Sequence, residues 1–399
     1  MPLSAQSPDH QTTPALTYEF AGDSRQTHTS FELNANKIYV PVRINNAGPY
    51  WFILDTGSVS NVVDTETAKS LGTPLKHPFE ARGGGETTVT GAIGSNVSLR
   101  IGELELKQAE ADVEPVNAAI SAAEGRRVDG LLGYDFFTRF VVVIDYLNRR
   151  VDVYEPASFH YVGPGEAIPF ETIRGNILVS TYLTMPDGKH VSGSFLIDTA
   201  WRSALTLTSP FVADHKLPTE VPRTVDAITG MGIGGATVDT MVRIPSLKLG
   251  GYPIENFVAN FSRAKAGVLS QNDFAGIIGA EILRRFKVVF DYPHHRMIIE
   301  PNAMFGSPYE FDMSGLFITS EGSTSNAFQV YNVIDGSPGA EAGMRAGDVI
   351  EAIDGQPAHS FTLEQIRQMF KEAEGKEHLL AFRRNGTALT AKIRLRRII

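Results

Sequence analysis

Two segments of the chain place an aspartate directly after an apolar run and before small, turn-forming residues. They are WFILDTGSVSNVV (Trp51–Val63) and SFLIDTAWRSALTL (Ser194–Leu207), and their aspartates, Asp55 and Asp198, are 143 residues apart. A carboxylate at the end of a buried strand is costly unless it is hydrogen-bonded or protonated. One such aspartate on its own is better explained as a turn cap or an acceptor of backbone N–H bonds than as a catalytic group. Its repetition favours catalysis.

Paired carboxylates have a defined chemistry. Two carboxyl groups that face one another in a cleft cannot both ionise easily, so they share a proton and titrate as a coupled pair. The ionised member can take a proton from a water that attacks an amide carbonyl, while the protonated member donates to the developing oxyanion. This chemistry needs no metal and no organic cofactor.

A second pair of segments repeats in the same order as the first. VDGLLGYDFFTRFVVVIDYLNRRVDVYEP (Val128–Pro156) matches FAGIIGAEILRRFKVVFDYPHHRMIIEP (Phe274–Pro301) along most of its length. The interval from the aspartate to the first glycine of this block is 75 residues in the first copy and 78 in the second. Two blocks repeated in order at nearly equal spacing predict a duplicated lobe. An approximate two-fold axis would then bring Asp55 and Asp198 face to face.

Short apolar alternations separated by turn residues predict mainly β structure from Phe31 to Pro301. The clearest alternation is Ile38, Val40, Val42 and Ile44, at every second position. Short helices are expected after each block. Their predicted positions are 65–71 (capped by Asp64 and followed by Gly72), a helix capped by Ser209 with Pro210 at its first position, 134–140 and 280–286.

The combination of these motifs resembles the aspartic peptidase family. The second half of that family's sequence motif is an apolar-apolar-Gly triplet. The matching triplets here are Leu131-Leu132-Gly133 and Ile277-Ile278-Gly279. The short lobes are more similar to retropepsin-like bacterial members, with two lobes fused in one chain, than to the longer pepsin. The resemblance implies a mainly β fold of two homologous acid-protease β-barrel lobes with an active-site cleft between them.

The resemblance also implies roles for individual residues. Asp55 and Asp198 would be the catalytic aspartates of an endopeptidase, Thr56 and Thr199 would hydrogen-bond across the lobe interface, and Ser58 would steady Asp55. One departure is that Ala200 takes the place of the glycine that is Gly57 in the first copy, and Trp201 takes the place of Ser58. The backbone N–H of an alanine can still bond a carboxylate, but alanine resists positive φ. A non-catalytic peptide-binding protein is the alternative function.

Each lobe holds a glycine-rich segment between its two blocks, ARGGGETTVTGAIG (Ala81–Gly94) and DAITGMGIGGATVD (Asp226–Asp239). The second contains a G-x-G-x-x-G pattern, which in a strand-to-helix turn would bind a dinucleotide. The following ATVDTMVRI is rich in β-branched residues, which favours a β-hairpin. The resemblance implies two flaps over the cleft, and hairpins without a ligand role are the alternative. The flap glycines would be Gly83, Gly84, Gly85, Gly230, Gly232, Gly234 and Gly235.

After Pro301 the chain resembles the PDZ domains attached to bacterial proteases, on the residues SPGA (337–340), AGMRAGDVI (342–350) and IDG (353–355). A small α/β domain is therefore expected at 311–399. PDZ domains add an extended peptide to a sheet edge and hold its terminal carboxylate with backbone N–H groups. The second glycine of the usual loop is absent, and a docking module without a peptide ligand is the alternative. The expected groove consists of Gly315, Leu316, Phe317, Ile318, Thr362 and Ile366.

The remaining domain predictions are a disordered or extended leader at 1–30 and lobes at 31–156 and 157–302. A protein or peptide substrate in the cleft and C-terminal peptides at the PDZ domain are the expected partners. A net charge of −9 disfavours nucleic acid, and the chain has no apolar run of about 18 residues to span a membrane. It has no cysteine and no H-E-x-x-H spacing for a metal. An exported location follows from the resemblance alone, because residues 1–15 lack a signal pattern. Fusion of the lobes makes a monomer sufficient for catalysis.

Overall fold

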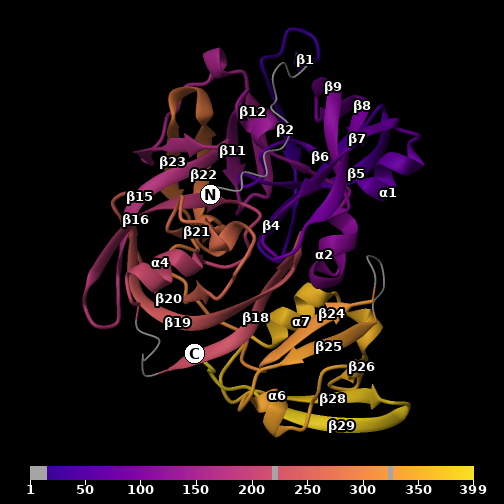
Figure 1. Ribbon diagram of the computed structural model, residues 1–399, viewed down its shortest axis with the longest axis vertical. Helices are drawn as coiled ribbons and strands as arrows, with labels where there is room; N and C mark the ends of the chain where they lie inside the picture. Colours follow the sequence, from indigo (N-terminus) through magenta and orange to yellow (C-terminus); the bar gives the residue numbers. More distant parts are fainter. Residues whose placement is uncertain (1–15, 218–222, 322–326) are drawn as a thin grey trace.

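The computed structural model describes residues 16–217, 223–321 and 327–399. As the sequence predicts, the chain is mainly β, and its described residues form four sheets (Figure 1). Two large sheets build the two lobes, a third joins them, and the fourth belongs to the C-terminal domain. No helix in the described ranges is both long enough and apolar enough to cross a membrane.

The first lobe is a nine-stranded sheet. Its pairings run in a closed circuit, β9-β6-β10-β5-β4-β8, because β9 also pairs with β8. The four predicted apolar positions of β4 are buried, but Lys37 and Tyr39 on its other face are buried as well, so only the second half of the strand alternates. The strands are β1 (Thr17–Phe20), β3 (Glu32–Asn34), β4 (Lys37–Ile44), β5 (Ala47–Leu54), β6 (Val62–Asp64), β7 (Leu75–Ala81), β8 (Val89–Ile101), β9 (Leu104–Glu114) and β10 (Gly130–Leu132).

The second lobe is an eight-stranded sheet with the same internal plan. Its circuit is β15-β16-β21-β17-β20-β19, closed because β19 also pairs with β15. The strand before each Asp-Thr segment pairs in parallel with the Gly-apolar-apolar strand of its own lobe, β5 with β10 and β16 with β21. The strands are β14 (Glu171–Ile173), β15 (Asn176–Thr184), β16 (His190–Asp198), β17 (Leu205–Leu207), β18 (Thr224–Gly232), β19 (Gly235–Leu249), β20 (Tyr252–Ser262) and β21 (Gly276–Gly279).

A six-stranded sheet, ordered β13-β23-β22-β11-β12-β2, holds the two lobes together. At its centre the two copies of the repeated hairpin meet, because β11 of the first lobe's copy pairs antiparallel with β22 of the second lobe's copy. Val143 lies opposite Val289 in this pairing, and both are buried. An antiparallel pairing between equivalent strands is what an approximate two-fold relation between lobes produces. The strands are β2 (Gln26–Ser30), β11 (Val141–Asp145), β12 (Arg150–Tyr154), β13 (Glu166–Pro169), β22 (Phe286–Asp291) and β23 (Arg296–Pro301).

Strands β1 and β2 lie in the segment expected to be a disordered or extended leader. β1 pairs with β9, and β2 pairs with β12 over five residues. Thr27 and Thr29 on β2 are buried, which gives this segment a regular inner face despite its polar composition. Residues 17–20 and 26–30 are therefore strands of the sheets, joined by a turn, and residues 1–15 lie outside the described residues.

The helices are short. Asp64 caps α1 through the N–H groups of Glu66 and Thr67, as predicted. The cap of α4 is Thr208, not Ser209 as expected, because the Thr208 hydroxyl accepts from the Phe211 N–H. Helix α2 was not anticipated. The helices are α1 (Thr65–Ser70), α2 (Val116–Glu124), α3 (Tyr134–Phe137), α4 (Ser209–Asp214), α5 (Ala280–Leu283), α6 (Pro338–Glu341) and α7 (Leu363–Met369).

The C-terminal domain has its own sheet and its own core, separate from the cores of the lobes. The predicted capping box at the start of α7 is confirmed, with Thr362 and Gln365 each bonding the other's backbone N–H. This domain, orange and yellow in Figure 1, lies beneath α2 and beside β18. Its strands are β24 (Leu316–Ser320), β25 (Phe328–Val333), β26 (Val349–Ile353), β27 (Gln356–Pro357), β28 (Glu377–Arg384) and β29 (Thr387–Arg394).

Candidate active site

Asp55 and Asp198 lie at the ends of equivalent strands, one directly after β5 and one as the last residue of β16. The Asp55 N–H donates to Leu132 O at 2.9 Å, which ties the first aspartate to the neighbouring apolar-apolar-Gly strand. The two Asp-Thr turns meet at the lobe interface. A Cβ added to Gly57 would lie 2.5 Å from Asp198 Oδ2, so the first turn contacts the second carboxylate directly.

The glycines of the apolar-apolar-Gly triplets are required by this close packing. A Cβ on Gly133 would lie 2.1 Å from Ser60 O, and one on Gly279 would lie 2.2 Å from Ser203 O. Real Cβ atoms do not approach backbone oxygens so closely. Each glycine therefore allows the loop after its aspartate to pass against the neighbouring strand.

Thr56 and Thr199 form a reciprocal network across the interface beneath the aspartates. Each hydroxyl accepts from the other residue's N–H at 3.1 Å. Thr56 Oγ1 also donates to Ile197 O at 2.7 Å, and Thr199 Oγ1 donates to Leu54 O at 2.6 Å. Both threonines are at most 1% exposed. Because each hydroxyl satisfies two backbone groups of the opposite lobe, the network holds the two aspartate turns in register.

Backbone N–H groups orient the two carboxylates. Asp55 Oδ1 accepts from the Gly57 N–H at 2.8 Å, and Asp198 Oδ1 accepts from the Ala200 and Trp201 N–H groups at 2.7 and 2.9 Å. The Ser58 hydroxyl, expected to steady Asp55, donates instead to Ser60 O. The Ser58 contribution comes from its backbone N–H, which lowers the pKa of Asp55.

The electrostatics favour one shared proton. Burial raises the pKa of both carboxyl groups, and the negative charge of Asp198 raises the pKa of Asp55 further. The N–H groups of the turns and the Lys37 ammonium act in the opposite direction. The net effect is a raised pKa for both carboxyl groups, and because the two charges would repel one another, the pair titrates together.

A buried ion pair beside the aspartates was missed by the sequence analysis. Lys37 Nζ lies 2.7 Å from Glu124 Oε1, and Tyr39 Oη donates to Glu124 Oε2 at 3.1 Å. Lys37 and Tyr39 share strand β4, whereas Glu124 ends helix α2. No motif in the sequence links these residues. The one available signal for α2 was the Ala-rich run VNAAISAAE followed by Gly125, which ends the helix with a φ of 70°.

Ala200 occupies the glycine position of the second triplet without backbone strain. It is not among the described residues with positive φ, and neither is Gly57. Positive φ, which would disfavour alanine, is therefore not required at this position. What distinguishes the two positions is space, because Gly57 faces the Asp198 carboxylate without room for a methyl group.

We expect Gly57→Ala to reduce turnover by about a hundredfold, because a methyl group would displace the Asp198 carboxylate, and misplacements of about 1 Å have that effect. Ala200→Gly should leave turnover within about twofold and lower stability by about 0.5–1 kcal/mol through the added chain entropy. Steady-state kinetics and thermal unfolding of the two variants check this. Equal losses of activity in both variants would contradict the spatial argument.

The two glycine-rich segments are hairpin tips that contact one another. The Gly85 N–H donates to Ile233 O at 2.9 Å, and the Thr87 N–H donates to Gly234 O at 3.1 Å. The first tip joins β7 to β8 and the second joins β18 to β19. The G-x-G-x-x-G segment is thus a hairpin and no strand-to-helix turn. Residues of both tips line the same cavity as the two aspartates.

A cavity of about 360 Å³ lies between the tips and the aspartates. Glu114, at the end of β9, also faces this cavity, and burial with the nearby Asp112 raises its pKa to about 7. No group of three or more metal-ligating side chains occurs within the described ranges. The cavity is lined by both aspartates and their turns, and by Arg82, Gly83, Gly84, Gly230, Met231, Gly232 and Ile233, among others.

The expected groove of the C-terminal domain faces the lobes. Gly315, Leu316, Phe317 and Ile318 line a second cavity between the domains, of about 120 Å³. The two helix residues expected in the groove, Thr362 and Ile366, do not line this cavity. Thr362 caps α7, and Ile366 is fully buried in the domain core. The residues of α7 and its C-terminal end that line this cavity are Arg367, Phe370 and Lys371.

The end of α2 occupies part of the space between β24 and α7. Ser320 Oγ donates to Ala122 O at 3.2 Å, and Arg367 donates to Ala123 O. A Cβ on Gly125 would lie 2.7 Å from Leu363 Cβ. The C-terminal domain therefore packs against helix α2. The last residue of this helix, Glu124, forms the ion pair with Lys37 that lies beside the aspartates.

Residues 40–136 match a model of the aspartyl protease family. The first lobe carries an aspartyl protease domain. The matched range contains Asp55 and the Gly133 triplet, and residues 329–384 match a PDZ domain model. The family resemblance stated from the motifs is thereby confirmed, and a PDZ domain is a peptide- or protein-binding module. No curated protein matches the chain. The second lobe lies outside the aspartyl protease match, so its equivalence rests on the internal repeat.

Proposed function

We propose that this protein is a single-chain aspartic endopeptidase that hydrolyses peptide bonds with a water activated by Asp55 and Asp198. The observation that supports this most directly is the pairing of two buried carboxylates at the floor of a cavity large enough for a peptide segment. The aspartyl protease match to the first lobe supports the same reaction class.

In the proposed reaction the ionised aspartate takes a proton from a water held between the carboxyl groups. The water oxygen attacks the peptide carbonyl, and the protonated aspartate donates its proton to the carbonyl oxygen as the tetrahedral intermediate forms. Collapse of this intermediate breaks the C–N bond, and the amine leaves with the proton that the first aspartate received. The second aspartate takes a proton back from a hydroxyl of the intermediate, which becomes the carboxylic acid product. The turn N–H groups keep the carboxylates oriented throughout.

The hairpin tips would act as flaps in this reaction. Their glycines let backbone approach backbone closely, so an extended substrate can lie between them and the aspartates. Opening the tips breaks the hydrogen bonds of Gly85 and Thr87 with the opposite tip, and closing over a peptide excludes bulk water. The PDZ domain would contribute peptide or partner docking.

A statine-type peptide, whose hydroxyl mimics the tetrahedral intermediate, tests the proposal. We expect it to bind the unmodified protein at least about a hundredfold more tightly than the matching peptide without the hydroxyl, as measured by calorimetry. It should also inhibit cleavage of an unfolded protein substrate between acid and neutral pH. Equal binding of the two peptides, with no cleavage at any pH, would favour a non-catalytic peptide-binding protein.

A further inference from the structure

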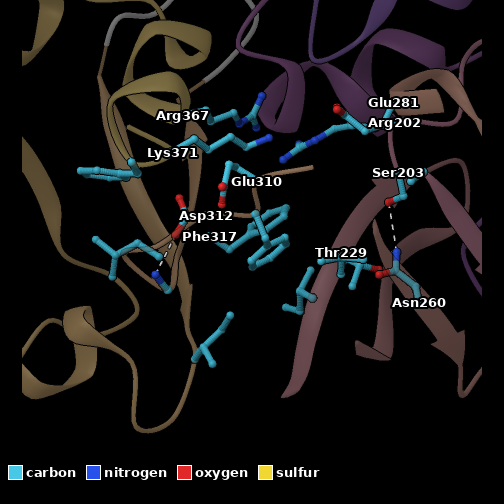
Figure 2. A pocket seen from close by; sticks show the side chains of 18 of the residues that line it. Arg202, Ser203, Thr229, Asn260, Glu281, Glu310, Asp312, Phe317, Arg367 and Lys371 are labelled. Carbon is cyan, nitrogen blue, oxygen red and sulfur yellow. Dashed lines mark hydrogen bonds between the residues drawn. The ribbon is translucent and has the colours of Figure 1, made fainter. Parts of the chain in front are cut away.

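The cavity between the PDZ domain and the second lobe gathers positive charge. Arg367 and Lys371 reach it from α7 and its C-terminal end, and Arg202 reaches it from the loop that follows the second Asp-Thr segment. Figure 2 shows the nitrogen ends of Lys371 and Arg202 directed toward one another from opposite walls. Two positive charges that lie close together repel one another, and an anion bound between them would offset this repulsion.

These cations have few partners of their own. Within the described residues, neither the Lys371 ammonium nor the Arg202 guanidinium has a hydrogen bond or an ion pair in the structure. Arg367 donates one bond to Ala123 O, while its buried Nη1 has no partner there. Burial and the Arg202 charge lower the pKa of Arg367 to about 9, and burial lowers the pKa of Lys371. An anion would offset these costs.

The carboxylates around the cavity are already engaged. Glu281 accepts from Asn36 at 2.7 Å and pairs with Arg284 and Arg285 at 2.8 and 3.1 Å. Glu310 pairs with Arg397 at 2.6 Å. Glu281 attracts Lys371 at longer range, but its oxygens are committed to closer donors. The unmatched charge in the cavity is therefore positive.

The backbone loop that would hold a peptide carboxylate in a PDZ domain is filled by a side chain of this chain. Asp312 Oδ1 accepts from the N–H groups of Ser314 and Gly315 at 2.9 and 2.7 Å. The Leu316 N–H donates to Ser314 Oγ at 3.1 Å. With these donors occupied, a ligand carboxylate in this groove has to be met by side chains.

The cavity adjoins the one that holds the aspartates. Arg202, Ser203 and Thr229 line both cavities. Arg202 follows Asp198 by four positions, and Thr229 lies on β18, the strand that leads to the second flap tip. A peptide that left the aspartates in the direction of β18 would therefore approach the PDZ domain.

We propose that this second cavity binds a carboxylate of an extended peptide, held by Arg202, Arg367 and Lys371 in place of the backbone loop used by other PDZ grooves. Its role as a substrate subsite rests on the proposed peptidase function, whereas carboxylate binding itself does not. The carboxylate belongs either to the C-terminus of the peptide or to an acidic side chain, and the experiment separates these sources.

The test uses the full-length chain with Asp55→Asn, which removes cleavage, and fluorescent dodecapeptides with randomised central positions. One pair differs in a free acid or an amide at the C-terminus, and another pair differs in Glu or Gln near it. We expect the acid member of at least one pair to bind about tenfold more tightly, since a hydrogen-bonded charge pair contributes that much. The pair that shows the preference identifies the source.

Adding Lys371→Gln or Arg202→Gln should remove most of this preference while binding of the amide peptide is retained. Lys189→Gln, a matched loss of one charge on a hairpin whose lysine is 78% exposed, should keep the preference. Equal binding within both pairs, or a preference that survives both cavity variants, would overturn the proposal. Cleavage by the unmodified chain is scored separately, so an inactive protein that still prefers acid peptides refutes only the peptidase function.

Discussion

Asp55→Asn and Asp198→Asn are each expected to lower kcat/KM for peptide hydrolysis by about a thousandfold or more. An asparagine can neither take the proton of the attacking water nor return one, and loss of positioned acid–base catalysis has effects of this size. Either substitution alone should have the full effect, because the two groups act as one unit. Cleavage of an unfolded protein substrate, followed from acid to neutral pH, is the measurement.

A matched aspartate outside the cleft is the control. Asp187 lies on an exposed turn beside Lys189, so Asp187→Asn should retain the activity of the unmodified protein. Residual activity above about a tenth in either Asp55→Asn or Asp198→Asn would refute the proposed pair as the catalytic groups.

The same asparagine variants should not be less stable, which separates lost chemistry from lost folding. The pKa of Asp55 is raised in the folded protein, so the folded state holds this proton more tightly than the unfolded state. The resulting stabilisation is present below the unfolded pKa of about 4 and is lost as pH rises through the folded pKa. We therefore expect the unfolding temperature of Asp55→Asn to rise relative to that of the unmodified protein as pH increases from about 4 to 8.

Thr56→Val and Thr199→Val are expected to have the largest effect on stability, about 2–4 kcal/mol each. Valine keeps the shape of threonine but leaves one buried carbonyl and one buried N–H of the opposite lobe without a partner, at about 1–3 kcal/mol for each group. Because the network sets the distance between the aspartates, turnover should fall as well. Urea unfolding followed by tryptophan fluorescence reports on this site, since both tryptophans lie in the lobes.

Serine at the same positions is the control, because it keeps the hydroxyl and loses only the methyl group. Thr56→Ser and Thr199→Ser should recover most of the stability that the valine variants lose. If the valine and serine variants unfold at the same urea concentration, the hydrogen bonds are not the source of the effect.

Much of the architecture was predictable because it is written in local patterns and in repetition. Alternating apolar residues predicted the strands, and the doubled blocks predicted two equivalent lobes whose hairpins now meet as β11 and β22. The capping residues of α1 and α7 were also readable, since a cap depends on a few consecutive residues. At α4 the predicted cap, Ser209, lies one residue after the observed cap, Thr208. Both residue types can cap a helix, and packing selects between them.

Contacts between distant segments could not be predicted in this way. The Lys37–Glu124 pair joins strand β4 of the first lobe to a helix residue 87 positions later, and no periodicity relates the two positions. The meeting of the two hairpin tips depends on how the lobes are rotated about their joining sheet. The occupation of the PDZ loop by Asp312 required side-chain positions that no motif specifies.

The sequence by itself determined a mainly β chain with duplicated lobes, an aspartate in each, and a PDZ domain, because strand period, repetition and motif are local properties of the chain. Only the tertiary structure decided how these parts face one another. In the folded protein Asp198 lies against Gly57, and the Ser58 hydroxyl bonds Ser60 O and not Asp55. The side chains of Arg202, Arg367 and Lys371 line the same cavity. Such arrangements follow from the packing of whole sheets, where the burial of apolar faces sets the geometry and the polar side chains take the positions that remain.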